Sequence, residues 1–218
     1  MARMLDNMTV SRNEMFKGAA RVVISDPDVL TSFPGRMESV INPAVPISGD
    51  AYALASGWVD LGPTNTDGVT IGRTADLSDG IEVDQRNANL DEGEPDSWEM
   101  TAEMTLLHTT LDNFNYAWAA GSSRAHAAGA QVAQHSLTLD APTTFTERML
   151  ACIQQDQKRD QMRVIVFRKA VPQADSEMVM TKTDPSELPC NFTLRIDPSI
   201  AEGYGEFGVI YEEDALGE

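Results

Sequence analysis

The stretch GWVDLGPTNTDGVTIG, residues 57–72, decides the fold class of this chain. A short run containing Trp58 and Val59 ends at Gly62, and a polar segment rich in Asn, Thr, Asp and Gly follows. Val69 and Ile71 then alternate with polar residues, as a half-buried strand requires. The stretch therefore predicts a strand, a turn and a second strand that the turn places beside the first.

The alternation of apolar and polar residues continues downstream. The segment SWEMTAEMTLL, residues 97–107, gives the longest strand signal, with Glu99 and Glu103 on one face. The opposite face is apolar and consists of Trp98, Met100, Ala102, Met104 and Leu106. We expect this apolar face, and all three tryptophans of the chain, to lie in a core, while the charged face points toward water or a lumen.

One segment changes the period and predicts a helix. Leu107, Leu111, Phe114 and Trp118 are spaced four, three and four residues apart, which predicts a helix over about 107–119. Short strand patterns follow in HSLTLDAP, TERMLACIQQ, QMRVIVFRKAV, EMVMTKT and PCNFTLRID. Many short strands with one helix favour a mainly β fold, a two-sheet β-sandwich or partly closed barrel with one flanking α-helix.

The chain divides into three unequal parts. Residues 1–45 keep no period for long and predict an extended N-terminal arm with at most one short strand. Residues 46–200 carry the β domain, and residues 201–218 add one strand, FGVIY, and an acidic tail. No apolar run has the length of a secretory core or a membrane span, so we expect a protein that is made in the cytoplasm and has no membrane partner.

Charge and cysteine content exclude several classes of protein. The chain has 34 acidic and 16 basic residues, a formal net charge of −18, which disfavours nucleic-acid binding, although acidity often serves only solubility. Cys152 and Cys190 are too few for a disulfide scaffold or a four-cysteine metal site. They allow one bridge, but we expect two reduced, half-buried thiols.

The sequence predicts no catalysis, no cofactor and no metal site. His108, His126 and His135 form none of the paired-histidine motifs of metal sites, and no nucleophile elbow or phosphate loop occurs. Carboxylates are so frequent that a pair of them carries little information about glycosidase chemistry.

Five pieces of the sequence, in this order, resemble the major tail proteins (tail tube subunits) of long-tailed bacteriophages. They are GWVDLGPTNTDGVTIG, IEVDQRNANL, the acidic loop after it, SWEMTAEMTLLHTTLDNFNYAW and LPCNFTLRIDPS. The resemblance covers residues 55–120 well and 160–200 more loosely. Residues 119–135, rich in Ala and Gly, and the N-terminal arm have no clear counterpart in the family.

The resemblance implies a structural virion protein that is assembled in the host cytoplasm. Its partners would be further copies of itself, in hexameric rings stacked into a tube, and the tape measure, tail terminator and baseplate or tip proteins. DNA would pass through the tube without specific binding. The acidic residues Glu82, Asp84, Glu99 and Glu103 would then line the lumen; the plainer alternative is an ordinary solvated strand face.

A second acidic segment is expected to contact the adjacent ring. It contains Asp91, Glu92, Glu94 and Asp96, and we hypothesise that it docks on a basic patch of Lys158, Arg159 and Arg163. The alternative is a mobile loop. Two other functions remain open from the sequence: the ring subunit of a bacterial secretion needle, and a β-sandwich binding module on a virion surface, which would display exposed aromatic residues.

Overall fold

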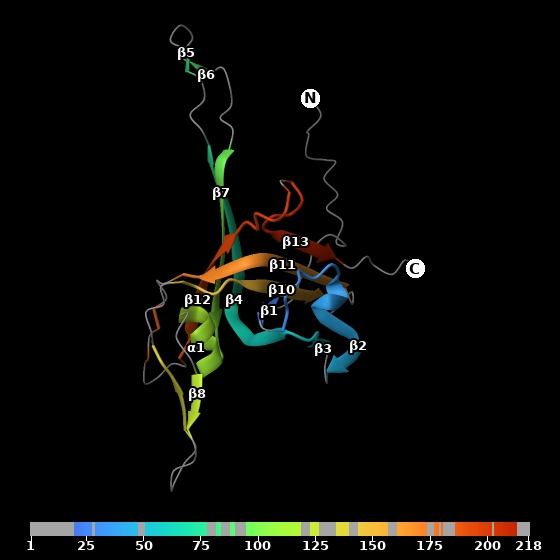
Figure 1. The fold of residues 1–218 in the computed structure, drawn as a ribbon, viewed down its shortest axis with the longest axis vertical. Coiled ribbons are helices and arrows are strands. Elements are labelled where there is room, and N and C mark those ends of the chain that lie inside the picture. The colour runs from blue at the N-terminus through green and yellow to red at the C-terminus, as the bar shows by residue number, and fades with distance from the viewer. Residues whose placement is uncertain are drawn as a thin grey trace, which may run out of the picture.

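The protein is mainly β with a single α-helix in the part of the chain that the structure, a computed structural model, describes (Figure 1). The described residues are 20–27, 29–47, 51–77, 82–83, 88–89, 95–118, 123–126, 134–139, 144–156, 161–173, 177–178, 180, 186–201 and 203–212. The predicted fold class is confirmed.

Seven strands form the main sheet: β1 (Ala20–Ser25), β4 (Trp58–Leu77), β7 (Pro95–Leu106), β10 (Arg148–Asp156), β11 (Gln161–Pro172), β12 (Leu188–Arg195) and β13 (Gly208–Glu212). Three two-stranded pairs accompany it: β2 (Ile41–Ile47) with β3 (Ala51–Leu54), β5 (Glu82–Val83) with β6 (Ala88–Asn89), and β8 (Ser123–His126) with β9 (Gln134–Leu137). The helices are the 3-10 turn η2 (Met37–Ser39) and α1 (Leu111–Trp118).

The main sheet closes on itself as a barrel. Its strand order is β10-β1-β4-β7-β12-β11-β13, and β10 also pairs with β11, so six strands form a ring and β13 lies outside it on β11. Every pairing in this sheet is antiparallel. Within the ring, closure gives each of the six strands a partner on both sides, and β13 lies at the margin.

The six ring strands contribute to one core inside the barrel. Its fully buried members include Ile24, Leu61, Leu106, Leu150 and Phe192, from β1, β4, β7, β10 and β12. β11 adds Phe167 and Ala170, which are three residues apart because its pairing with β10 is irregular between them. Otherwise, successive side chains of the ring strands point alternately into and out of the barrel. This period-two alternation is the pattern that the sequence shows.

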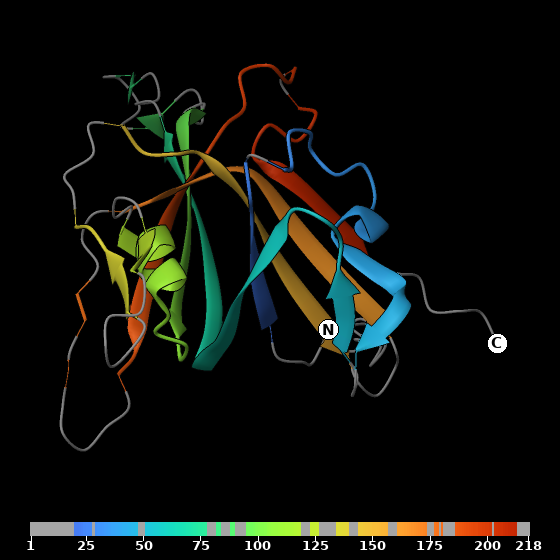
Figure 2. The same ribbon diagram turned by 60° about the horizontal axis from the view of Figure 1, so that its bottom comes forward.

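A second core covers the outer face of β1, β10 and β11. Val23, Ala151 and Val164 point outward from these strands and are fully buried. The residues that pack over them lie before, within and after η2, at the start of β2 and at the end of β3: Leu30, Phe33, Met37, Val40, Ile41 and Leu54. Figure 2 shows this layer on one side of the barrel and α1 on the opposite side. The strand RVIVF therefore has an apolar layer on both faces, as its continuous apolar run predicts.

Residues 20–45 do not form the extended arm that the sequence predicts. β1 is a ring strand between β10 and β4, with Val22, Val23 and Ile24 buried, and Val40 and Ile41 belong to the outer core. Pro34 and its neighbours break local periodicity, but pairing with distant strands orders the segment regardless of local pattern. The barrel therefore runs from Ala20, and β13, Gly208–Glu212, overlaps the predicted C-terminal strand FGVIY.

The opening stretch also differs from the prediction. Residues 58–77 form one continuous strand whose first part pairs with β1 and whose second part pairs with β7. The expected turn is an irregularity between Thr64 and Val69, where Asn65 Oδ1 accepts a hydrogen bond from the Asp67 N–H at 3.1 Å. The polar segment is therefore an irregular part of one strand and not a hairpin turn. β4 pairs with β1 before this segment and mainly with β7 after it.

Candidate assembly surface

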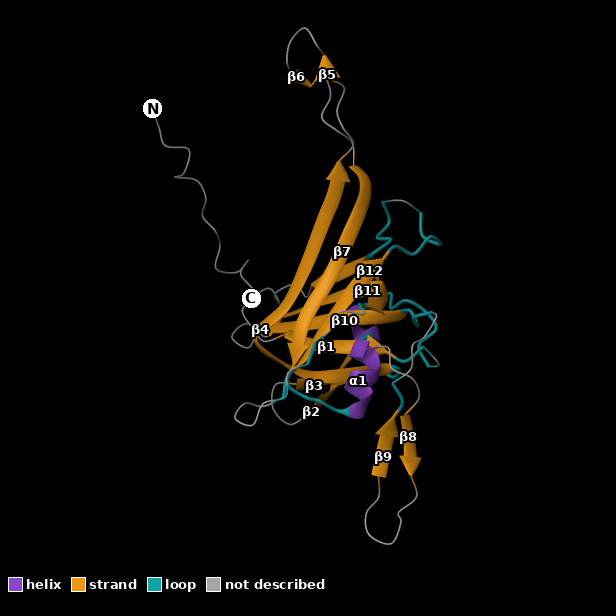
Figure 3. Cartoon of the chain, turned by 90° about the vertical axis from the view of Figure 1, so that its left-hand side faces the viewer, coloured by secondary structure: helices purple, strands orange, loops and turns teal. Residues whose placement is uncertain are grey.

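Strands β4 and β7 continue beyond the barrel as a two-stranded ribbon. Their pairing runs from Thr64 opposite Leu106 to Leu77 opposite Pro95. At the barrel end Ala102, Met104 and Leu106 are buried, whereas Trp98, farther along β7, is 45% exposed. Figures 1 and 3 show the ribbon rising from the barrel, with β5 and β6 at its far end. An isolated two-stranded ribbon is marginally stable in water, so this one gains from a partner.

One face of the ribbon is a partly exposed, mainly apolar strip, formed by Ile71, Arg73, Ala75, Trp98 and Met100. These residues share a face because Ile71 pairs with Ala102, Arg73 with Met100 and Ala75 with Trp98. Ile71 is 36% exposed, and the Arg73 guanidinium carbon lies 4.0 Å from the centre of the Trp98 ring. On β7 the strip lies on the same face as the core residues Ala102 and Met104. It extends beyond Met100, the last β7 residue that pairs with β12. The expectation that Trp98 faces the core is therefore wrong.

The other face of the ribbon is acidic and polar. Glu103 pairs with Thr70, Glu99 with Thr74, and Asp76 with Ser97, whose hydroxyl donates to Asp76 Oδ2 at 3.2 Å. Asn191 and Thr193 of β12 extend the same face beside Glu103 and Thr101. Thr70, Thr74, Asp76, Glu99 and Glu103 are exposed. This acidic face carries the three carboxylates of Asp76, Glu99 and Glu103. The next residue of β12 on the same face is Arg195, which pairs with Glu147 at 3.7 Å.

Of the predicted lumen residues, the structure brings Glu99 and Glu103 onto one face. Glu82 is in strand β5, but its side chain lies outside the described residues, and so does all of Asp84. Sequence reasoning missed Asp76, although the alternation of β4 continues to it and would have found it.

The predicted inter-ring contact cannot be placed on the described chain. Asp91, Glu92 and Glu94 lie outside the described residues, as do Lys158 and Arg159. Asp96 is within β7, but its side chain is not described. Arg163 is described, and its guanidinium pairs with Glu212 of β13 at 3.0 Å. Docking of the acidic loop on this patch therefore stays a prediction.

Two of the sequence motifs meet at the base of the ribbon. Asn113 of α1, only 4% exposed, donates to the carbonyls of Leu61 at 2.8 Å and His108 at 2.7 Å. Leu61 belongs to GWVDLG and Asn113 belongs to TTLDNF. The two hydrogen-bonded residues are 52 positions apart in the sequence. The helix begins at Leu111 instead of about 107, because Thr110 Oγ1 accepts from the Asn113 N–H at 3.2 Å and starts the first turn.

The side chains of the described residues form no group of three or more that could hold a metal ion. Cys152 and Cys190 are free and buried, and burial raises the pKa of each thiol to about 12. Both thiols therefore stay neutral at physiological pH and have no access to a substrate. In the described part of the chain, no helix has the length and apolarity to span a bilayer.

A scan against protein-family models finds no matching family, and a search of curated proteins finds no matching relative. The function is therefore argued from the ribbon, its two unlike faces and the sequence motifs.

Proposed function

We propose that this protein is a tail tube subunit of a long-tailed bacteriophage, a structural virion protein whose copies assemble into stacked hexameric rings. The observation that carries the proposal is the β4–β7 ribbon, which leaves the barrel with an apolar strip on one face and carboxylates on the other. A monomer gains nothing from an exposed Trp98 and Ile71 on an unsupported ribbon. A ring of copies covers them.

The two unlike faces of the ribbon fit a tube wall that separates the body of the ring from the channel. Ribbons from neighbouring copies, placed side by side, extend into one sheet around a closed ring, and closure leaves no exposed strand edge. The apolar strip then packs toward the body of the ring, and the acidic face of Asp76, Glu99 and Glu103 faces the channel. Carboxylates repel DNA phosphates, so DNA slides through without binding.

Negative-stain electron microscopy of the purified full chain at rising concentration tests assembly. We expect rings and then hollow tubes with sixfold end views. Trp98→Glu removes the largest apolar side chain of the strip and places a charge there, so we expect it to raise the concentration needed for assembly at least about tenfold.

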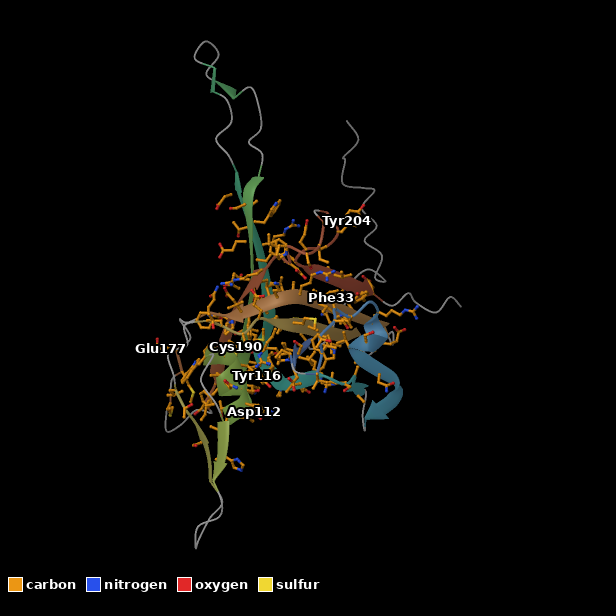
Figure 4. The ribbon with its side chains drawn as sticks, in the orientation of Figure 1. Phe33, Asp112, Tyr116, Glu177, Cys190 and Tyr204 are labelled. Atoms are coloured by element: carbon orange, nitrogen blue, oxygen red, sulfur yellow. The ribbon has the colours of Figure 1, made fainter. Side chains whose placement is uncertain are left out.

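The matched control is Tyr204→Glu, which introduces the same charge at a side chain that is 77% exposed on the loop before β13 (Figure 4). This variant should assemble as the unmodified chain does. Both variants should keep the same circular dichroism spectrum, because neither residue is in a core. Monomers at every concentration, or equal assembly by both variants, would contradict the proposed role of the strip.

One observation favours a second function, a β-sandwich binding module. The exposed Trp98 with Arg73 stacked on it is a surface that a protein or carbohydrate ligand can contact. Such a module would remain monomeric at all concentrations and would be retained by a glycan or protein array through Trp98. The assembly experiment therefore separates the two functions.

A further inference from the structure

A groove of about 520 Å³ lies at the margin of the main sheet, away from the ribbon. Met37 and Ile41 form one wall, and Met162 of β11 with Ile210 and Tyr211 of β13 complete its lining. Tyr211 is opposite Val164 of the outer core and Ile210 is opposite Ile165, so the Tyr211 side chain is on the groove's face of β13 and the Ile210 side chain is on the other face. Two hydrogen bonds fix the η2 wall: Tyr211 Oη donates to the Pro34 carbonyl at 2.6 Å, and Trp58 Nε1 donates to the Ser39 carbonyl at 3.0 Å. The groove is therefore part of the folded structure and largely apolar.

One wall of the groove is also a strand edge. β13 pairs with β11 on one side, and no described residue pairs with its other side. Ile210 is 62% exposed in the middle of this strand. An edge with unpaired backbone groups beside an apolar groove is a site for an added strand, which bonds through its backbone and places alternate side chains in the groove.

We propose that residues 1–19 of this chain dock as an extended segment along the free edge of β13 and place their apolar side chains in the groove. The proposal depends on the edge and the groove alone and is independent of the proposed function.

The position where the described chain begins supports this occupant. Ala20 pairs with Gln154, Gln154 with Arg163, and Arg163 with Glu212, so these four residues form one row across the sheet. Residue 20 is thus three strand spacings, roughly 14 Å, from the end of β13 that lines the groove. Nineteen extended residues reach roughly 60 Å, several times this distance.

The chemistry of the segment also matches the groove. It contains seven large apolar residues: Met1, Met4, Leu5, Met8, Val10, Met15 and Phe16. Met4, Met8 and Val10 are separated by even numbers of residues, so they share one face of an extended segment. Flexible methionine side chains adapt to an irregular groove such as this one.

Charge favours the same occupant. Residues 1–19 contain three basic and two acidic residues, in a chain where acidic residues outnumber basic ones by more than two to one. Carboxylates of Glu38 and Glu212 line the groove, with Arg36 as its basic member. Glu212 is already paired with Arg163, so Glu38 is the carboxylate of this rim that attracts a segment with a basic excess.

Limited trypsin digestion of the full-length protein tests the docking. The rate of cleavage after Arg12 is measured by mass spectrometry in the full chain and in a synthetic peptide of residues 1–19. Docking should slow cleavage in the full chain at least about tenfold, because the protease cuts only the undocked population. Ile210→Glu should remove this protection, since it replaces an exposed apolar side chain in the middle of the proposed docking edge by a charge. Repeating the digestion at several protein concentrations shows whether the segment docks on its own copy or on a neighbour.

Tyr204→Glu is the matched control and should keep the protection. A second variant avoids any effect on the barrel: Met4→Ser, Met8→Ser and Val10→Ser together should lose protection with the groove unchanged. Cleavage of the unmodified chain at the peptide's rate would overturn the proposal. Protection that survives both Ile210→Glu and the triple substitution would also overturn it.

Discussion

At the scale of single residues, GWVDLG is a structural motif in which successive side chains have separate contacts. Trp58 is in the outer core, Leu61 is in the inner core, and Asp60 accepts hydrogen bonds from Arg21 at 2.7 Å and from the Gly62 N–H at 2.9 Å. Gly62 has φ 91°, a conformation that side-chain-bearing residues avoid. The motif joins β1, β4 and the start of α1.

Gly62→Ala should destabilise the fold strongly. A Cβ at this position would lie 2.6 Å from His108 Nδ1, so the substitution adds a clash to the cost of a positive φ. We expect a loss of about 3 kcal/mol in the free energy of unfolding, measured by urea denaturation. Gly68→Ala is the control, because Gly68 also has a positive φ but nothing lies within 4 Å of its Cβ position. It should lose only about 1 kcal/mol. Equal losses would show that His108 moves aside at no cost.

At the scale of elements, β7 shows that a single alternating pattern can serve two environments. Its apolar face is core at Met104 and Ala102 and solvent-exposed at Trp98, with no change in the sequence pattern. The position of this boundary depends on where β12 ends beside β7, since Met100 is the last β7 residue that pairs with β12. The acidic face continues past the same boundary without interruption.

Charge reversal on this acidic face should make the assembled tube bind DNA. In the double variant Glu99→Lys and Glu103→Lys, each substitution removes a repelling charge and adds a phosphate partner. We expect at least about tenfold more short duplex DNA to co-sediment with tubes at low salt, and this gain to disappear as salt rises.

The control for net charge is Glu177→Lys with Glu187→Lys. Both residues are exposed, and Glu177 lies away from the ribbon (Figure 4). Tubes of this variant should bind DNA as weakly as the unmodified tubes. Equal binding by the two double variants would mean that net charge alone, and not position on the acidic face, governs DNA retention.

At the scale of the whole molecule, barrel closure produces an interior that excludes water. Cys152 on β10 and Cys190 on β12 point into this interior from strands that do not pair with each other. Both are 5% exposed or less, and desolvation raises the pKa of each thiol to about 12. Neither ionises in the folded state below that pH, while both do so in the unfolded chain above about pH 9.

The fold should therefore lose stability at alkaline pH. Between about pH 9 and 12 the unfolded state releases thiol protons that the folded state keeps, so unfolding becomes easier by about 1.4 kcal/mol per pH unit for each thiol. Urea denaturation under reducing conditions at pH 8 and pH 10 measures this loss. The double variant Cys152→Ala and Cys190→Ala should lose about 2 to 3 kcal/mol less over the same interval. Burial also raises the pKa of Tyr116 and Tyr211, but these residues are common to both proteins. Identical losses would mean that water reaches the thiols.

The sequence by itself determined the mainly β class, a helix within about 107–119, the long strand that begins near residue 97 and the acidic face of Glu99 and Glu103. These features follow from the period of apolar residues, which depends only on local backbone geometry. Tertiary structure decided that β1 is a ring strand, that residues 58–77 form one long strand, and that Trp98 is exposed. Each of these depends on which distant strand supplies the hydrogen bonds and where that strand ends. A local pattern states which residues share a face, but only the neighbouring strands decide whether that face is covered.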